Sequence, residues 1–165
     1  MTSPTIRPAT RADAAALAAI YNPYIEQTTI SFEETPVTPD DMARRIDDVN
    51  DAALPWLVLE TDGRVRGYAY ATKWRVRPAY RHSVETSVYL EGGAHGQGWG
   101  GALYRALIDL LRAKGIHLVI GGIALPNERS VALHEAMGFA KAAHFCEVGF
   151  KCDRWIDVGY WQLRL

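Results

Sequence analysis

The sequence predicts a mixed α/β (α+β) fold in which helices flank a single mixed sheet, and three observations carry this prediction. The chain has 165 residues, the size of one domain. Apolar runs of strand length alternate with segments of helical periodicity. An Asp62-Gly63 turn joins two of the runs into a hairpin, which makes part of the sheet antiparallel. Because no linker, repeat or low-complexity tract divides the chain, we expect one domain over residues 1–165.

The first half of the chain is expected to hold a strand, two helices and a hairpin. Thr10 and Asp13 have the spacing of a capping box, and apolar residues follow at helical intervals. Thr38 supplies a second capping hydroxyl, with a proline at the next position and acids in the first turn. The elements expected are a strand near Ile6, helices after Thr10 and from Thr38 to about Asn50, and hairpin strands at Trp56–Glu60 and Val65–Thr72.

The second half is expected to alternate strands and helices before a closing pair of strands. A glycine-rich stretch, residues 92–101, opens a helix that closes at Lys114-Gly115, and a later helix stops at Gly138. The elements expected are strands at Val84–Leu90 and Leu118–Ile123, a helix at Asn127–Met137, and strands around Phe145 and at Val158–Leu165.

Charge, cysteine count and histidine spacing exclude several classes of protein. Lysine and arginine number 18, and aspartate and glutamate 19, so a net charge of −1 provides no positive field for nucleic acid or an anionic membrane. Two cysteines are too few for a disulfide framework, and no run is long enough for a membrane span or a leader, so we expect a cytoplasmic protein. His82, His117 and His144 lack metal-ligand spacing, so we expect no metal.

The run from His95 to Gly101, His-Gly-Gln-Gly-Trp-Gly-Gly, lies between a predicted strand and a predicted helix. Free N–H groups at a helix N-terminus favour an anion, and glycines let a ligand approach the backbone closely, so the run predicts a phosphate site. A flexible surface loop is the alternative. A Walker loop is excluded because no GK[ST] follows, and the Gly-x-Gly-x-x-Gly match to a dinucleotide fold lacks the acidic residue expected about 20 positions later.

Three segments carry a family resemblance: Val84–Leu90, the loop His95–Gly100, and Asn127 through Gly138-Phe139. They resemble the GCN5-related N-acetyltransferase (GNAT) superfamily, whose acetyl-CoA motif is Gln/Arg-x-x-Gly-x-Gly/Ala after a strand, with a later Asn and a helix ending in Gly-Phe. His95 replaces the first Gln or Arg, whereas Gly98 and Gly100 stay in register.

Six ordered segments are similar to the phosphinothricin N-acetyltransferase branch of that superfamily. The resemblance implies a mixed sheet of six or seven strands with about four helices, splayed at its central strands, with acetyl-CoA as cosubstrate and a homodimer as the assembly. The segments are Tyr21–Glu26, Pro55–Val58, Trp74–Tyr80, Leu125–Asn127, His134–Ala136 and Trp155–Leu163.

Glu85 and His134 are the candidate catalytic residues. Glu85 lies in an apolar run, where desolvation would raise its pKa, and the resemblance implies a general base; a solvated strand edge is the alternative. Most of the superfamily has a tyrosine at the position of His134 to protonate the departing thiolate, and the branch has His; a structural helix residue is the alternative.

The resemblance also implies binding residues. Asn127 would cap its helix in any case, and arginines near Trp74 suit a carboxylate or phosphinate, with a solvated loop as the alternative. The implied acetyl-CoA contacts are Val88, Tyr89, Leu90, His95, Gly96, Gln97, Gly98, Trp99, Gly100, Gly101 and Asn127. The implied acceptor contacts are Phe32, Arg75, Arg77 and Tyr80.

We therefore expect an acetyl-CoA-dependent N-acetyltransferase acting on the amino group of a small amino-acid analogue of the phosphinothricin or methionine sulfoximine type, a resistance-type activity. The same chemistry on a protein N-terminus or a polyamine is one alternative, although Arg75 and Arg77 would repel a cationic acceptor. A non-catalytic CoA-binding sensor is another. The expected partners are thus a small amine and a second copy of the chain, with no nucleic acid and no membrane.

Overall fold

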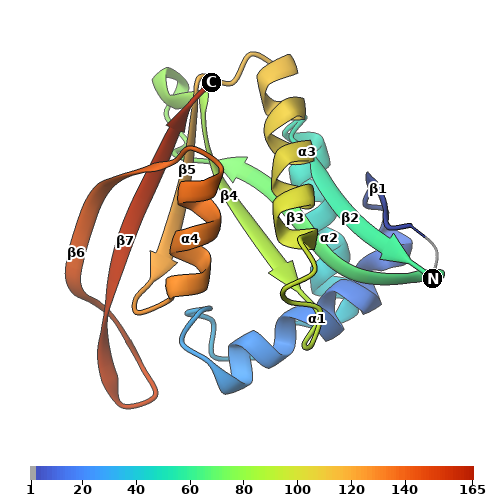
Figure 1. The fold of residues 1–165 in the computed structure, drawn as a ribbon, viewed down its shortest axis with the longest axis horizontal. Helices are drawn as coiled ribbons and strands as arrows, with labels where there is room; N and C mark the ends of the chain where they lie inside the picture. Colours follow the sequence, from blue (N-terminus) through green and yellow to red (C-terminus); the bar gives the residue numbers. More distant parts are fainter. Residues whose placement is uncertain (1–2) are drawn as a thin grey trace.

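The structure, a computed structural model that describes residues 3–165, is built on one seven-stranded sheet with the strand order β1-β2-β3-β4-β5-β7-β6 (Figure 1). Residues 1 and 2 of the predicted domain range lie outside the described residues. The strands are β1 (Thr5–Pro8), β2 (Trp56–Thr61), β3 (Arg64–Lys73), β4 (Ser83–Leu90), β5 (Leu118–Ala124), β6 (Ala140–Lys151) and β7 (Arg154–Arg164). The mixed α/β sheet with flanking helices is confirmed.

Helices cover both faces of this sheet. Alternate residues of β2 divide between two cores, because neighbouring side chains on a strand point to opposite faces. The helices are α1 (Ala14–Gln27), α2 (Pro39–Asp51), α3 (Trp99–Ala113) and α4 (Glu128–Ala136), with single 3-10 turns at Arg11–Asp13 and Pro78–Tyr80. Trp56 and Val58 pack with α1 and α2, whereas Leu57 and Leu59 pack with α3.

The predicted start signals act as capping boxes. The Thr38 hydroxyl accepts from the Asp41 N–H at 3.1 Å, and the Asp41 carboxylate accepts from the Thr38 N–H at 3.2 Å. Thr10 and Asp13 form the equivalent box before α1. Both boxes satisfy N–H groups that a helix start would otherwise leave unpaired.

The sheet splits open between β4 and β5. These strands are parallel, and their pairing covers only Ser83–Glu85 against Leu118–Ile120, whereas the other neighbouring strands among residues 3–165 pair antiparallel. Beyond Glu85 the two strands separate. The splay at the central strands is therefore confirmed, and it leaves backbone groups at the sheet centre free for a ligand.

The C-terminal strands form a long hairpin whose order in the sheet differs from its order in the chain. β7 pairs with β5, and β6 lies outside it at the edge. None of the helices among residues 3–165 has both the length and the apolar character needed to cross a bilayer.

Candidate active site

Three adjoining cavities lie along the gap between β4 and β5. The first, of about 500 Å³, is bounded by β4 and the N-terminal turns of α3 and α4, and the last, of about 570 Å³, lies on the α1 side of the sheet. A narrow cavity of about 60 Å³ shares Val88 and Asn127 with the first and Ser87 and Gly122 with the last. The three form one path through the sheet, which we call the cofactor cavity, the neck and the acceptor cavity.

The glycine-rich loop shapes the wall of the cofactor cavity. Gly96 has φ +82° and Gly98 has φ +78°, a left-handed conformation that favours glycine. Gly98 is the N-cap of α3, so the N–H groups of the first turn of α3 face the cavity with the positive end of the helix dipole. This arrangement suits the pyrophosphate of a nucleotide cofactor.

The outer half of β4 offers backbone groups to the same cavity. The Glu91 N–H bonds back to the Arg66 carbonyl on β3, and strand alternation then directs the backbone groups of Val88 and Leu90 away from β3, into the gap. The Leu90 carbonyl accepts a hydrogen bond from the Tyr24 hydroxyl at 2.6 Å. Val88, which has no β5 partner, is therefore placed to bind an extended amide chain as a neighbouring strand would.

Most of the predicted cofactor residues meet at this cavity. Gln97 does not, because it lines a separate pocket on the other side of the loop with Glu91. Arg129, which was not predicted, lies at the start of α4 and brings a positive charge to the cavity. The predicted residues that line the cavity are Val88, Tyr89, Leu90, His95, Gly96, Gly98, Trp99, Gly100, Gly101 and Asn127.

Two of these residues, His95 and Asn127, have surroundings that fix their chemical state or their hydrogen bonds. Burial lowers the pKa of His95, and the nearby Arg129 charge lowers it further, so His95 is neutral at neutral pH. The Asn127 oxygen accepts from the Ser130 N–H at 3.1 Å, which caps α4. Asn127 also lines the cofactor cavity.

His134 is buried, with 4% of its surface exposed, and lines the neck. Nδ1 lies 2.7 Å from the Ser130 carbonyl oxygen, which can only accept, so the ring carries its proton on Nδ1. Nε2 then accepts from the Tyr104 hydroxyl at 2.9 Å, and Tyr104 accepts from Thr86 at 2.6 Å. Burial lowers the pKa of His134 and raises that of Tyr104, so both are neutral and linked in one chain.

Glu85 lines the acceptor cavity on the opposite face of β4. Burial raises its pKa, and the Arg75 charge acts in the opposite direction. Gly122 makes room for it: a Cβ there would lie 3.1 Å from Glu85 Oε1, while a Cβ on Gly121 would lie 2.4 Å from His134 Nε2. Two consecutive glycines thus admit one candidate catalytic side chain on each face of β5.

Phe32 reaches the acceptor cavity from the loop after α1 and rests on β6. A Cβ at Gly149 would lie 2.3 Å from the Phe32 ring, so only glycine fits there. Lys151, buried at the end of β6, donates to the carbonyls of Ile25 and Ser31 at 2.7 and 2.6 Å. These two bonds fix the loop to the hairpin and so position Phe32, and no local sequence pattern predicted them.

The structure separates the predicted acceptor residues. Arg75 stacks over Trp74, with Cζ 4.9 Å from the ring, and its charge acts on Glu85 and Tyr160. Arg75, Arg77 and Tyr80 are all exposed, and none of them is among the residues that line the acceptor cavity. Their role in acceptor binding stays a prediction, and Arg75 differs only in that its charge acts on Glu85.

Among residues 3–165, one group of side chains of metal-ligand type meets outside this path. It consists of His144, Cys146 and Asp157, whose ligand atoms lie within 4.8 Å of one another. Histidine spacing alone did not reveal it, because the other two members are a cysteine and an aspartate from a neighbouring strand.

The arrangement fits the transfer of a chemical group from one ligand to another, with the two ligands meeting in the neck. An anion-binding helix start and an unpaired strand edge would hold a long phosphorylated cofactor, and a carboxylate of raised pKa would accept a proton on the other side. The buried Tyr104–His134 pair adjoins the place where the two would react.

Comparison with known proteins agrees with this geometry. The model of the acetyltransferase (GNAT) domain matches residues 6–159. The chain is 42% identical to a phosphinothricin N-acetyltransferase of Streptomyces viridochromogenes over 95% of this chain and 85% of that one. It is 37% identical to an L-methionine sulfoximine/L-methionine sulfone acetyltransferase of Salmonella typhimurium, over 98% of this chain and 94% of that one. The structure of YncA from Salmonella typhimurium, with its cofactor acetyl-CoA, superposes on this chain with a TM-score of 0.96 at 36% identity. The superposition covers 99% of this chain and 95% of that one.

Proposed function

Because the chain belongs to the acetyltransferase (GNAT) family and is an N-acetyltransferase, we propose that it acetylates the α-amino group of a small anionic amino-acid analogue of the phosphinothricin or methionine sulfoximine type. Acetyl-CoA supplies the activated acetyl group. The continuous path through the sheet carries the proposal, because it offers a long cavity for the cofactor and a separate one for the acceptor.

Cofactor binding is assigned to backbone groups and a few side chains. The first turn of α3 binds the pyrophosphate, with Arg129 contributing positive charge, and the free edge of β4 at Val88 and Leu90 binds the pantetheine amides. Gly96 and Gly98 admit the phosphates because they carry no Cβ. Asn127 contributes its amide from the start of α4.

The proton steps are assigned to two groups on opposite faces of the sheet. Glu85 accepts the proton of the acceptor ammonium, directly or through water, and its raised pKa brings it closer to the working pH of a base. On the other face, the departing sulfur receives a proton from the Tyr104 hydroxyl through Nε2 of His134, and the phenol is reprotonated from solvent through the same imidazole after the product leaves the neck. No metal is assigned to these steps.

Acceptor binding is assigned to Arg75, with Phe32 packing over the side chain of the substrate. A guanidinium forms charge-assisted hydrogen bonds with carboxylate, phosphinate or sulfoximine oxygens. Arg77 and Tyr80 keep the same predicted role at the outer rim, which requires movement of their segment toward the cavity.

The assembly is assigned as a homodimer and the location as cytoplasmic. The β6–β7 hairpin exposes Phe145, Val148, Phe150 and Trp155, and Trp155 shows 62% of its surface. Such a patch suits a protein interface. Exposed free thiols at Cys146 and Cys152 are compatible with a reducing compartment.

An acceptor screen tests the proposal. Release of free CoA from acetyl-CoA would be followed against phosphinothricin, methionine sulfoximine, methionine sulfone, the common amino acids, a polyamine and a peptide with a free N-terminus. We expect the analogues to give the highest kcat/KM. Turnover of the polyamine or the peptide alone would replace the proposed acceptor class, and acetyl-CoA binding without any turnover would favour a sensor.

A further inference from the structure

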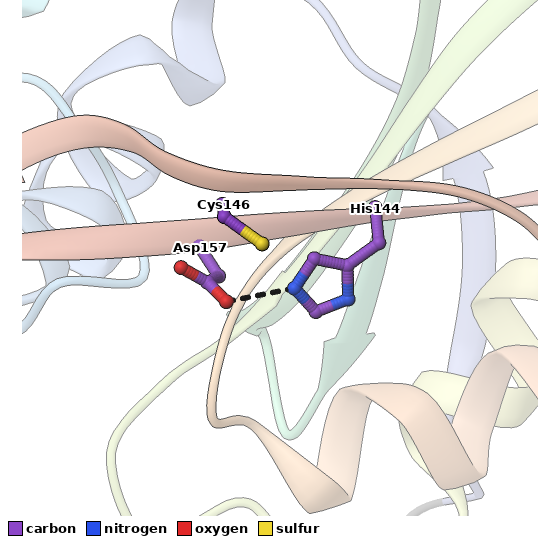
Figure 2. A group of neighbouring side chains, drawn as sticks. All are labelled: His144, Cys146 and Asp157. Carbon is purple, nitrogen blue, oxygen red and sulfur yellow. Dashed lines mark hydrogen bonds and ion pairs between the residues drawn. The ribbon is translucent and has the colours of Figure 1, made fainter.

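The group formed by His144, Cys146 and Asp157 lies on the β6–β7 hairpin (Figure 2), and none of its three members lines the cavities described above. His144 and Cys146 are two residues apart on β6, and Asp157 comes from the paired strand β7. Figure 2 shows the three side chains directed toward one another. The group therefore brings a nitrogen, a sulfur and an oxygen ligand to one place.

A bulge in β6 creates this convergence. The register of β6 against β7 shifts between Phe145 and Gly149, and Glu147 within the shift has φ +52°. The Glu147 N–H turns inward and donates to Asp157 Oδ1 at 2.8 Å. This bond holds the carboxylate in one orientation, and backbone support of this kind is typical around metal-ligating carboxylates.

The other bonds of the group show what an ion would displace. His144 Nε2 donates to Asp157 Oδ2 at 2.7 Å, and Lys141 Nζ donates to His144 Nδ1 at 2.9 Å. Lys141 is exposed, and its Nζ already lies over the Trp161 ring, 5.3 Å from the centroid, so it can keep this cation–π contact when it leaves the imidazole.

We propose that His144, Cys146 and Asp157 form a surface site for a divalent transition-metal ion of the zinc class, with water completing the coordination. Mixed N, S and O ligands suit Zn²⁺ or Co²⁺ and disfavour Ca²⁺ and Mg²⁺. With bonds of about 2.0–2.3 Å, tetrahedral ligand atoms lie roughly 3.3–3.7 Å apart, so atoms already within 4.8 Å need shift only by about 1 Å.

Binding of the ion releases one proton from the group and moves another within it. The Cys146 thiol releases its proton to solvent and binds as a thiolate. His144 stays neutral, its proton moves from Nε2 to Nδ1, and Nε2 ligates the ion. Asp157 binds through Oδ2 and keeps Oδ1 on the Glu147 N–H. Lys141 leaves Nδ1, because an ammonium cannot donate to a protonated nitrogen.

The site is connected to the acceptor cavity. Val148, within the bulge, and Val158, next to Asp157, both line that cavity. Phe145, between His144 and Cys146, packs edge-on against Tyr160 at 5.8 Å. An ion that tightens the bulge would shift this wall, so occupancy should change the acceptor KM; this consequence rests on the proposed function, whereas the binding itself does not.

Titration of the whole chain with Co²⁺ alone tests the binding. We expect one ion per chain and a Co²⁺–thiolate charge-transfer band in the near ultraviolet. Cys146→Ser should abolish the band, and Cys152→Ser, which removes the other exposed thiol, should leave it intact. His144→Gln and Asp157→Asn keep the thiol, and each should weaken binding by about tenfold or more.

Three outcomes would overturn the site: no thiolate band in the wild-type chain, a band lost in Cys152→Ser, or unchanged affinity in both His144→Gln and Asp157→Asn. The last outcome would indicate that Cys146 binds the ion without help from His144 and Asp157. Coupling is tested by measuring the acceptor KM with and without Zn²⁺ at saturating acetyl-CoA. A shift that His144→Gln abolishes supports the coupling, and an equal shift in both chains overturns it.

Discussion

Tyr104 donates its hydroxyl hydrogen to Nε2 of His134 over 2.9 Å, so the imidazole has no free proton on the side that faces this phenol. The proton that His134 does carry, on Nδ1, is bonded to the Ser130 carbonyl at 2.7 Å. His134 would therefore act together with Tyr104: a proton that leaves Nε2 has first to come from the phenol. His134 lines the neck, where the acetyl group would be transferred, and Tyr104 lies buried behind it.

The first prediction concerns this pair. Tyr104→Phe removes the hydroxyl and keeps the ring, so we expect kcat to fall by about ten- to 10²-fold, less than the roughly 10²- to 10⁴-fold of a complete loss of acid catalysis. The KM for acetyl-CoA should stay nearly unchanged. His134→Ala should lower kcat without recovery at high pH, because proton donation becomes harder there. Steady-state kinetics over a range of pH measures both.

Thr86→Val is the matched control for this pair. It removes the hydroxyl beyond Tyr104 and leaves the bond between Tyr104 and His134 in place. We expect a smaller loss of kcat than in Tyr104→Phe. Wild-type turnover in both His134→Ala and Tyr104→Phe would reduce the pair to a structural role.

The second prediction concerns Glu85. Burial raises its pKa above the ordinary 4.5, and only the carboxylate accepts a proton, so activity should rise with pH through this raised value. Glu85→Gln should lower kcat roughly 10²- to 10⁴-fold at neutral pH. Part of the activity should return at high pH, where more of the acceptor amine is already neutral. A pH profile with the same acidic limb in Glu85→Gln would assign that limb to another group.

The third prediction uses the glycine beside His134. A Cβ at Gly121 would lie 2.4 Å from His134 Nε2, so Gly121→Ala should displace the imidazole and break its bond to Tyr104. We expect kcat to fall toward the value of His134→Ala. Thermal unfolding, measured in parallel, distinguishes this displacement from loss of the fold. Unchanged kcat in a folded Gly121→Ala chain would contradict the need for this imidazole position.

The fourth prediction compares two glycines with the same backbone strain. Gly98 and Gly115 have φ +78° and +75°, and a Cβ at either would meet nothing within 4 Å. Alanine at each should lower the free energy of unfolding by roughly 1–2 kcal/mol. Only Gly98→Ala should also weaken acetyl-CoA binding, because Gly98 alone lines the cofactor cavity. Calorimetry gives the affinity; equal affinities in both variants would remove the loop from the cofactor site.

The fifth prediction separates the two arginines. Both arginines are exposed and neither lines the acceptor cavity, but the charge of Arg75 acts on Glu85 and no such effect links Arg77 to it. Arg75→Ala should raise the acceptor KM by about ten- to 10²-fold, the equivalent of 1.5–3 kcal/mol for a charge-assisted contact. Arg77→Ala should have a smaller effect in the same direction. A change in the acetyl-CoA KM instead would move this segment to the cofactor phosphates.

Local signals explain which parts of the fold could be predicted. The helix starts at Thr10 and Thr38 and the Asp62-Gly63 hairpin depend on residues a few positions apart, and all three are confirmed. The position of β7 between β5 and β6 depends on contacts far apart in the sequence, and no local pattern encoded it.

The sequence placed candidate site residues best where they lay in a continuous motif. The loop from His95 lines one cavity together with the outer half of β4, the strand that holds Glu85. Gln97 was placed with the loop, but the backbone turn around it directs the residue to another pocket. Tyr104 was missed, although it lies beside Leu103 and Leu107 in a predicted helix, where a buried phenol requires a hydrogen-bond partner. Lys151 was missed because only the folded hairpin buries it.

The path through the sheet also has a kinetic consequence. Since the cofactor and acceptor cavities share only Ile30 and Tyr89 among their lining residues and both adjoin the neck, each ligand has a cavity of its own and neither blocks the approach of the other. Initial velocities should therefore show a ternary complex with intersecting double-reciprocal lines, not the parallel lines of an acetylated enzyme intermediate. A bisubstrate compound that links the sulfur of CoA to an amino-acid nitrogen through a two-atom bridge would then occupy both cavities at once and compete with each substrate.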